Sequence, residues 1–90
     1  MRFDWDPGKG KRNFAKHGVS FEEAATVFGD PLYVDFFDPD HSEDENRYIR
    51  VGCSNQKRIL VVAYTERGEQ TRIISARPAT RHERQAYEQS

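Results

Sequence analysis

The stretch ILVVAYTERGEQTRIISARPATRHERQAY, from Ile59 to Tyr87, decides the fold of this chain. Its first five residues are all apolar, whereas a strand with only one covered face alternates apolar and polar residues. We therefore expect a central strand over 58–66 that is covered on both faces. A turn at Gly68 returns the chain as a second strand over 70–77, so the stretch predicts a β-hairpin.

A short helix is expected after this hairpin. Pro78 ends the second strand, and Thr80 and Glu83 have the spacing of a capping box at the start of a helix that runs to about Gln89. Helices from the first half of the chain can cover one face of the central strand. The other face must then be covered by the C-terminal helix, by a second subunit or by another protein.

The first third of the chain predicts two helices. Asp6 before Pro7 is typical of a helix N-cap, and the first helix runs to about His17, where Gly18 ends it. We expect Phe14 and Ala15 to face inward in this helix.

The second helix begins after Ser20, and Glu23 completes a capping box three residues later. Gly29 ends it. Apolar residues recur at helical spacing and predict a buried stripe: Phe21, Ala24, Ala25 and Phe28.

Three further segments have the two-residue period of strands, over residues 2–5, 32–37 and 46–54. Ninety residues leave room for one core. We therefore predict a single α+β domain over residues 1–90. It has a small antiparallel sheet of about four strands, two N-terminal helices and one C-terminal helix.

The charge of the chain is balanced overall but polarised along the sequence. It has 14 Lys and Arg against 15 Asp and Glu, yet residues 51–90 hold 7 basic and 4 acidic residues. Residues 30–45 contain seven acidic residues and no Lys or Arg. The C-terminal half is therefore suited to an anionic ligand, and the acidic segment to a basic partner.

Composition argues against several protein classes. One cysteine, Cys53, excludes an internal disulfide and a cysteine-based zinc site. No apolar run is long enough for a transmembrane helix, and the N-terminus lacks the apolar core of a signal peptide. We expect a cytoplasmic protein that needs no cofactor.

The arginines of the hairpin are the first candidate for chemistry. Cleavage of RNA without a metal needs a base for the 2′-hydroxyl, an acid for the 5′-oxygen and cations for the phosphorane. Arg72 and Arg77 are candidate clamps and Glu66 a candidate base. Strict alternation puts the two arginines on opposite faces unless a bulge intervenes. In the alternative interpretation, these are solvated charges paired across strands.

A second candidate is His17, at the expected end of the first helix beside Lys16. A helix C-terminus stabilises a cationic imidazole, which can then act as a general acid or bind phosphate. The alternative is that His17 only caps the last carbonyl groups. Tyr87 is either a packing residue or a catalytic phenol.

Metal chemistry is the weakest of the hypotheses. The acidic loop at residues 38–43 lacks the spacing of a calcium loop. A metal-dependent hydrolase would need His17, His41 and His82 to converge, and no two of them have ligand-like spacing.

Taken in order, several blocks of the sequence resemble one known family, BrnT, over nearly the whole chain. They are Phe3-x-Trp5-Asp6, Lys16-His17-Gly18-Val19, Asp40-His41-Ser42-Glu43, Tyr64-Thr65-Glu66-Arg67-Gly68, Ile74-Ser75-Ala76-Arg77 and Glu83-Arg84-x-x-Tyr87.

The resemblance implies a toxin of a bacterial type II toxin–antitoxin pair, with a fold like that of RelE-type ribonucleases. It implies RNA cleavage without metal, inhibited translation and neutralisation by a BrnA-like ribbon-helix-helix antitoxin. Operator DNA would be bound only through the antitoxin, in a homo- or hetero-oligomer. On this basis the candidate catalytic residues are Glu66, Arg72, Arg77 and His17, and the candidate RNA-binding residues are Lys16, Arg67, Arg81 and Arg84. The alternative is a non-catalytic module that binds nucleic acid or the antitoxin.

Overall fold

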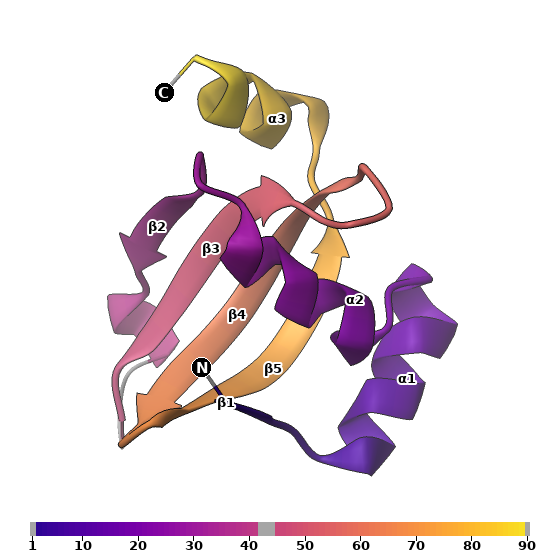
Figure 1. Ribbon diagram of the computed structural model, residues 1–90, viewed down its shortest axis with the longest axis vertical. Coiled ribbons are helices and arrows are strands. Elements are labelled where there is room, and N and C mark those ends of the chain that lie inside the picture. Colours follow the sequence, from indigo (N-terminus) through magenta and orange to yellow (C-terminus); the bar gives the residue numbers. More distant parts are fainter. Residues whose placement is uncertain (1, 42–44, 90) are drawn as a thin grey trace.

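The computed structural model describes residues 2–41 and 45–89. Figure 1 shows a twisted sheet with helices at one face, one edge and one end. The elements are β1 (Arg2–Asp4), α1 (Pro7–His17), α2 (Phe21–Thr26), the 3₁₀ turn η1 (Val27–Gly29), β2 (Val34–Phe37), the 3₁₀ turn η2 (Pro39–His41), β3 (Arg47–Cys53), β4 (Ile59–Arg67), β5 (Gln70–Pro78) and α3 (Arg81–Glu88). No helix of the described residues is long and apolar enough to cross a membrane.

The predicted α+β class is confirmed, but the sheet has five strands and is mixed. Its order is β1-β5-β4-β3-β2, with β4 in the centre as expected. The pairs β2–β3, β3–β4 and β4–β5 are antiparallel, whereas β1 runs parallel to the first third of β5. Asp4 lies beside Arg72 in that pair. The prediction of about four antiparallel strands missed this pairing because β1 and β5 are far apart in the sequence.

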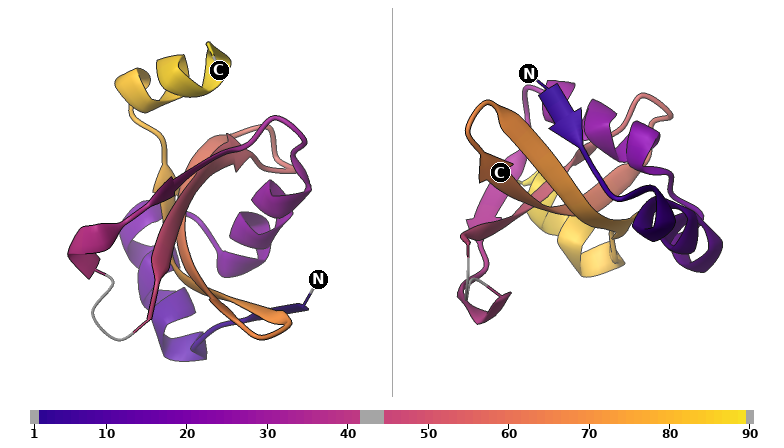
Figure 2. Two further views of the ribbon diagram at one scale, coloured as in Figure 1. Left: turned by 90° about the vertical axis from the view of Figure 1, so that its left-hand side faces the viewer. Right: turned by 90° about the horizontal axis from the view of Figure 1, so that it is seen from below.

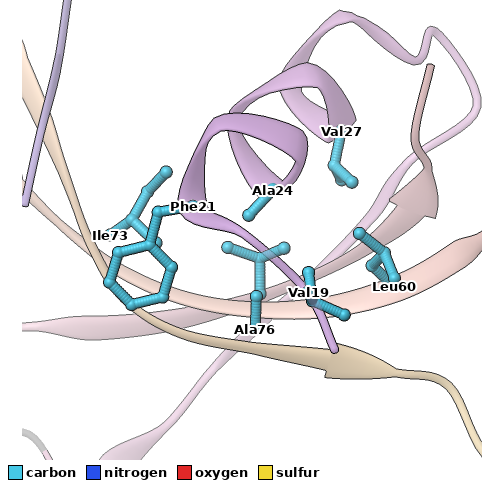
Figure 3. Packing of buried hydrophobic residues seen from close by; sticks show 8 residues of the cluster. Val19, Phe21, Ala24, Val27, Leu60, Ile73 and Ala76 are labelled. Carbon is cyan, nitrogen blue, oxygen red and sulfur yellow. The ribbon is translucent and has the colours of Figure 1, made fainter. Parts of the chain in front are cut away.

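The core lies between the helices and one face of the sheet, as Figure 3 shows. Leu60 and Val62 of β4 have no exposed surface, and they pack with residues from α2, η1, β5 and the α1–α2 turn. The remaining members of this cluster are Val19, Phe21, Ala24, Val27, Ile73 and Ala76. The predicted α2 stripe is thus correct, with Ala25 and Phe28 partly buried at its margin.

The prediction for the inward face of α1 was wrong. Phe14 is 58 % exposed and Ala15 is exposed, whereas Asn13 is 8 % exposed. The Asn13 amide donates to the carbonyls of Val19 (2.9 Å) and Ala76 (2.8 Å) and accepts from the Ala76 N–H (3.1 Å). It therefore binds β5 much as a neighbouring strand would, at a point beyond the end of β1.

The predicted capping box of α2 forms only in part. The Ser20 hydroxyl accepts from the Glu23 N–H at 3.0 Å, but the Glu23 carboxylate turns inward instead of back to Ser20. It accepts from the Ser54 hydroxyl at 2.7 Å and from the Arg58 guanidinium. Arg58 also donates to the Gly18 carbonyl at 3.0 Å. The box at Thr80 and Glu83 is complete.

α3 lies over one end of the second face of the sheet. Figure 2 shows α2 on one side of the sheet and α3 displaced toward the other side, near the ends of β3 and β5. No residue of α3 is buried. Of the residues of β4 on this second face, Val61 is 7 % exposed, Thr65 is 2 % exposed and Ala63 is half-buried. The apolar strand is thus largely buried on both faces, as the sequence predicted.

Replacement of Asn13 by alanine should destabilise the fold by about 3 kcal/mol, because it leaves two backbone groups of Ala76 without their partner in a buried site. Urea unfolding of Asn13→Ala measures this loss. Lys11→Ala, on the exposed side of the same helix, is the matched control and should change stability by less than about 0.5 kcal/mol. Equal stability of the two variants would contradict a structural role for the amide.

Candidate functional site

A bulge in β5 determines which of its side chains share a face. Ala63 of β4 pairs with Ser75, whereas the next residue, Tyr64, pairs with Ile73, so Ile74 is an extra residue in β5. Ile73 and Ala76 are both 1 % exposed and lie in the core. The alternation therefore shifts by one residue at Ile74.

As a consequence Arg72, Ser75 and Arg77 all lie on the second face of the sheet. The two arginines sit opposite Thr65 and Val61 of β4. These positions are four residues apart, roughly 13 Å at the usual rise of a strand. Arg72 and Arg77 thus share a face because of the bulge in β5.

Glu66 does not join these arginines. It pairs with Thr71, which lies on the core face of β5, and its side chain is exposed at the hairpin end of the sheet. The structure therefore does not bring the predicted base together with the predicted clamps.

Each hairpin arginine has a carboxylate partner. Arg77 binds Glu83 through two hydrogen bonds of 2.7 and 2.8 Å, and Arg67 binds Glu45 at 2.6 and 3.0 Å. Arg72 pairs with Asp4 of the adjoining β1. Hydrogen bonds from Arg77, more than any other contact, lower the pKa of Glu83 to about 2. These pairs hold the guanidinium groups in place and offset part of their charge.

The densest group of basic side chains lies on α1. Lys9, Arg12 and Lys16 follow one another at helical spacing on one side of the helix, and His17 ends it. Together with Asn13, Ile74 and Ser75 they line a shallow pocket of about 220 Å³. Figure 1 shows α1 beside the β5 edge of the sheet. Four basic side chains and a hydroxyl thus line one shallow site, a chemistry suited to a phosphate group.

The pocket unites residues that the sequence predicted and residues that it did not. His17 and Lys16 were predicted, whereas Lys9, Arg12 and Ser75 were not assigned to a site. The basic spacing along α1 was a usable signal for Lys9 and Arg12. Ser75 had none, because only the bulge turns it toward the second face.

The candidates on α3 lie apart from this pocket. Arg81 and Arg84 are exposed on the helix. The Tyr87 hydroxyl donates to Asp30, which also accepts from the Cys53 N–H at 2.8 Å. The hydrogen bond to Asp30, followed by burial, raises the pKa of Tyr87 to about 12. This phenol is therefore a tether between α3 and the loop after η1.

Arg50 is a buried charge that the sequence gave no reason to single out. Its guanidinium makes hydrogen bonds of 2.7 and 2.8 Å to Asp35 and lies 4.5 Å from the Phe28 ring centre and 3.8 Å from that of Tyr33. Paired and stacked in this way, it stabilises the fold. The described residues contain no group of three His, Cys, Asp or Glu side chains placed to hold a metal, and so no convergence of His17, His41 and His82.

A model of the family described as "Ribonuclease toxin, BrnT, of type II toxin-antitoxin system" matches residues 5–83. The chain belongs to the BrnT family. A similar solved structure is the crystal structure of the ribonuclease toxin BrnT of Brucella abortus, with 27 % sequence identity and a TM-score of 0.66. That match covers 90 % of this chain and 99 % of the Brucella chain. No curated protein matches the sequence. The resemblance noted in the sequence is therefore confirmed: this is a BrnT ribonuclease toxin of a type II toxin–antitoxin system.

Acid should destabilise the protein partly through Glu83. Its pKa in the folded state, about 2, lies below the ordinary value of 4.5, so its stabilising effect is present above pH 4.5 and is lost as the pH falls toward 2. The free energy of unfolding of Glu83→Gln should therefore fall less steeply over this range than that of the wild type. Urea titrations across the range measure both slopes, with Glu88→Gln on the same helix as control. Parallel curves for wild type and Glu83→Gln would refute the assignment.

Proposed function

We propose that this BrnT protein is an endoribonuclease that cleaves RNA by metal-independent acid–base chemistry at the pocket between α1 and β5. The observation that carries the proposal is the convergence of Lys9, Arg12, Lys16 and His17 on Ser75. Cleavage of a phosphodiester by its own 2′-hydroxyl needs cations around the phosphate and a group that transfers protons. The pocket offers both within a small volume.

In this proposal the scissile phosphate sits against the basic side chains of α1. The 2′-hydroxyl gives its proton to His17 as its oxygen attacks phosphorus, the bond to the 5′-oxygen breaks, and that oxygen takes a proton from solvent water. The products are a 2′,3′-cyclic phosphate and a 5′-hydroxyl. His17 is the proton-transferring group, since histidine exchanges protons most readily near neutral pH. Lys9, Arg12 and Lys16 stabilise the phosphorane charge.

The remaining arginines extend the RNA-binding surface. Ser75 lies in the pocket and, with Arg72 and Arg77, on the second face of the sheet, so the pocket and this face adjoin. Arg67, Arg81 and Arg84 lie farther out and bind flanking phosphates. RNA phosphates would compete with Asp4, Glu45 and Glu83 for these guanidinium groups. Glu66 lies at the hairpin end of the core face. It is a candidate base only if the bound RNA also contacts that end of the sheet.

The cellular role follows from the family. We propose that cleavage of messenger RNA in the cytoplasm inhibits translation and that a BrnA-like ribbon-helix-helix antitoxin neutralises the toxin. Operator DNA is bound through the antitoxin in this scheme. These steps are supported by the membership of the chain in a family of type II toxins.

The pocket predicts a specific ranking of variants. His17→Ala should lower the rate of RNA cleavage by about 100-fold or more, the usual effect of losing a general acid or base. Arg12→Ala should lower the cleavage rate and also weaken RNA binding and its salt dependence, because one cation that contacts the phosphate and stabilises the phosphorane is lost. Lys11→Ala, on α1 but outside the pocket, is the matched control. Single-turnover cleavage of a labelled RNA in EDTA measures the rates.

Three further observations decide between roles. A 2′-deoxy substitution at the cleaved position should abolish cleavage without preventing binding. If Glu66→Gln loses RNA cleavage and His17→Ala cleaves at the wild-type rate, the catalytic site lies at the hairpin end of the sheet and not in the pocket. Salt-dependent RNA binding without cleavage by the folded wild type would favour the non-catalytic alternative, in which the paired arginines contact only phosphates.

A further inference from the structure

The large exposed apolar side chains are concentrated in one segment. Five such residues occur among the described residues, and four of them belong to β2 and the loop before it: Leu32 (69 % exposed), Tyr33 (44 %), Phe36 (50 %) and Phe37 (53 %). Scattered apolar residues on a surface need no explanation, but a contiguous set is typical of an interaction site. Exposed aromatic residues on an edge strand also lower the solubility of the protein.

The same segment is an open edge of the sheet. In the sheet formed by the described residues, β2 is an edge strand, paired only with β3. The Asp38 N–H points toward β3, donating to the Arg47 carbonyl at 2.9 Å. Because successive residues of a strand point their N–H groups in opposite directions, Phe36 also faces β3, whereas Asp35 and Phe37 face outward. The outer edge can therefore accept a further strand.

An apolar groove adjoins this edge on the second face of the sheet. It has a volume of about 320 Å³ and is lined mainly by apolar and aromatic side chains of β2, β3 and α3, together with His82 and Glu83 of α3. A strand added to β2 would place every second side chain beside this groove and the others beside Phe37 on the core face. The edge of β2 supplies backbone hydrogen bonds to the added strand, and the groove favours apolar side chains on that strand.

Charge distinguishes the possible occupants of this edge. The chain from 30 to 45 contains seven acidic residues and no Lys or Arg. Asp35, Asp38 and Asp40 lie along β2 and directly after it. Asp35 is paired with Arg50, and Asp38 lies 2.9 Å from His41, so part of this charge is offset within the chain. A second copy paired edge to edge would bring two such segments together, and like charges would oppose it. A basic segment would meet complementary charge.

We propose that the β2 edge is the docking site of the antitoxin, which adds an extended segment of alternating apolar and basic side chains. This inference takes from the proposed function only the identity of the partner, an antitoxin. Three strand spacings separate β2 from β5, roughly 14 Å. An antitoxin anchored at the acidic edge therefore lies within reach of the RNA surface along the second face.

Two substitutions at one position isolate the backbone contact. Phe37→Ala removes the ring and keeps the outward N–H, whereas Phe37→Pro removes both, and proline is tolerated in edge strands where the N–H faces solvent. Phe37→Pro should weaken antitoxin binding at least 10-fold more than Phe37→Ala. Phe36→Ala tests the groove. Phe14→Ala, an equally exposed aromatic residue on α1, is the control and should leave binding unchanged.

The experiment is titration of each purified variant with the antitoxin of the same operon, together with amide hydrogen exchange of the wild-type toxin, free and bound. Protection of β2 with the expected ranking supports the proposal. Protection confined to other elements, a toxin dimer through β2 that the antitoxin does not displace, or no antitoxin binding overturns it. RNA cleavage by Phe37→Pro, measured without antitoxin, should match that of the wild type. If neither the wild type nor any variant cleaves RNA, the result counts against the proposed nuclease function and leaves the docking proposal unaffected.

Discussion

The amide of Asn13 is the contact on which the geometry of the site depends. Its bonds to both backbone groups of Ala76 join α1 to β5 two residues after the bulge, and its bond to Val19 fixes the turn into α2. Since β1 covers only the first third of β5, the rest of that edge would otherwise lack a partner at this point. The residue that closes the edge also fixes the distance between the basic side of α1 and Ser75.

A partly buried ion pair, Glu23–Arg58, provides the second link between the helices and the sheet. Glu23 is 4 % exposed, and hydrogen bonding to Arg58 is the largest cause of its lowered pKa. The same guanidinium reaches Gly18, where α1 ends. Ser54 extends the network to the β3–β4 turn. Because the hydrogen bonds of this cluster join residues of different elements, they favour one arrangement of α1, α2 and the sheet.

Local patterns could predict much of this fold, because they are properties of neighbouring residues. The hairpin, the central strand and both N-terminal helices follow from periodicity and caps. Asn13 illustrates what could not be predicted: its partner Ala76 is 63 residues away, and on local evidence Phe14 is the better core residue. The parallel pairing of β1 also joins residues 68 positions apart, Asp4 and Arg72, and the burial of Arg50 depends on partners in other elements. Within the candidate site, His17 and Lys16 were accessible from the sequence, whereas Ser75 became recognisable only through the bulge.

The extra residue in β5 also constrains how this chain can vary in length. Side chains of a strand alternate strictly, so a one-residue deletion in a regular strand exchanges the two faces beyond it. Loss of Ile74 is an exception, because Ile73 and Ser75 would then become neighbours opposite Tyr64 and Ala63. Arg72, Ser75 and Arg77 would keep one face, and Ile73 and Ala76 the other. The strand can therefore lose this one residue without exchanging inside for outside, whereas a second deletion would make that exchange over the rest of the strand.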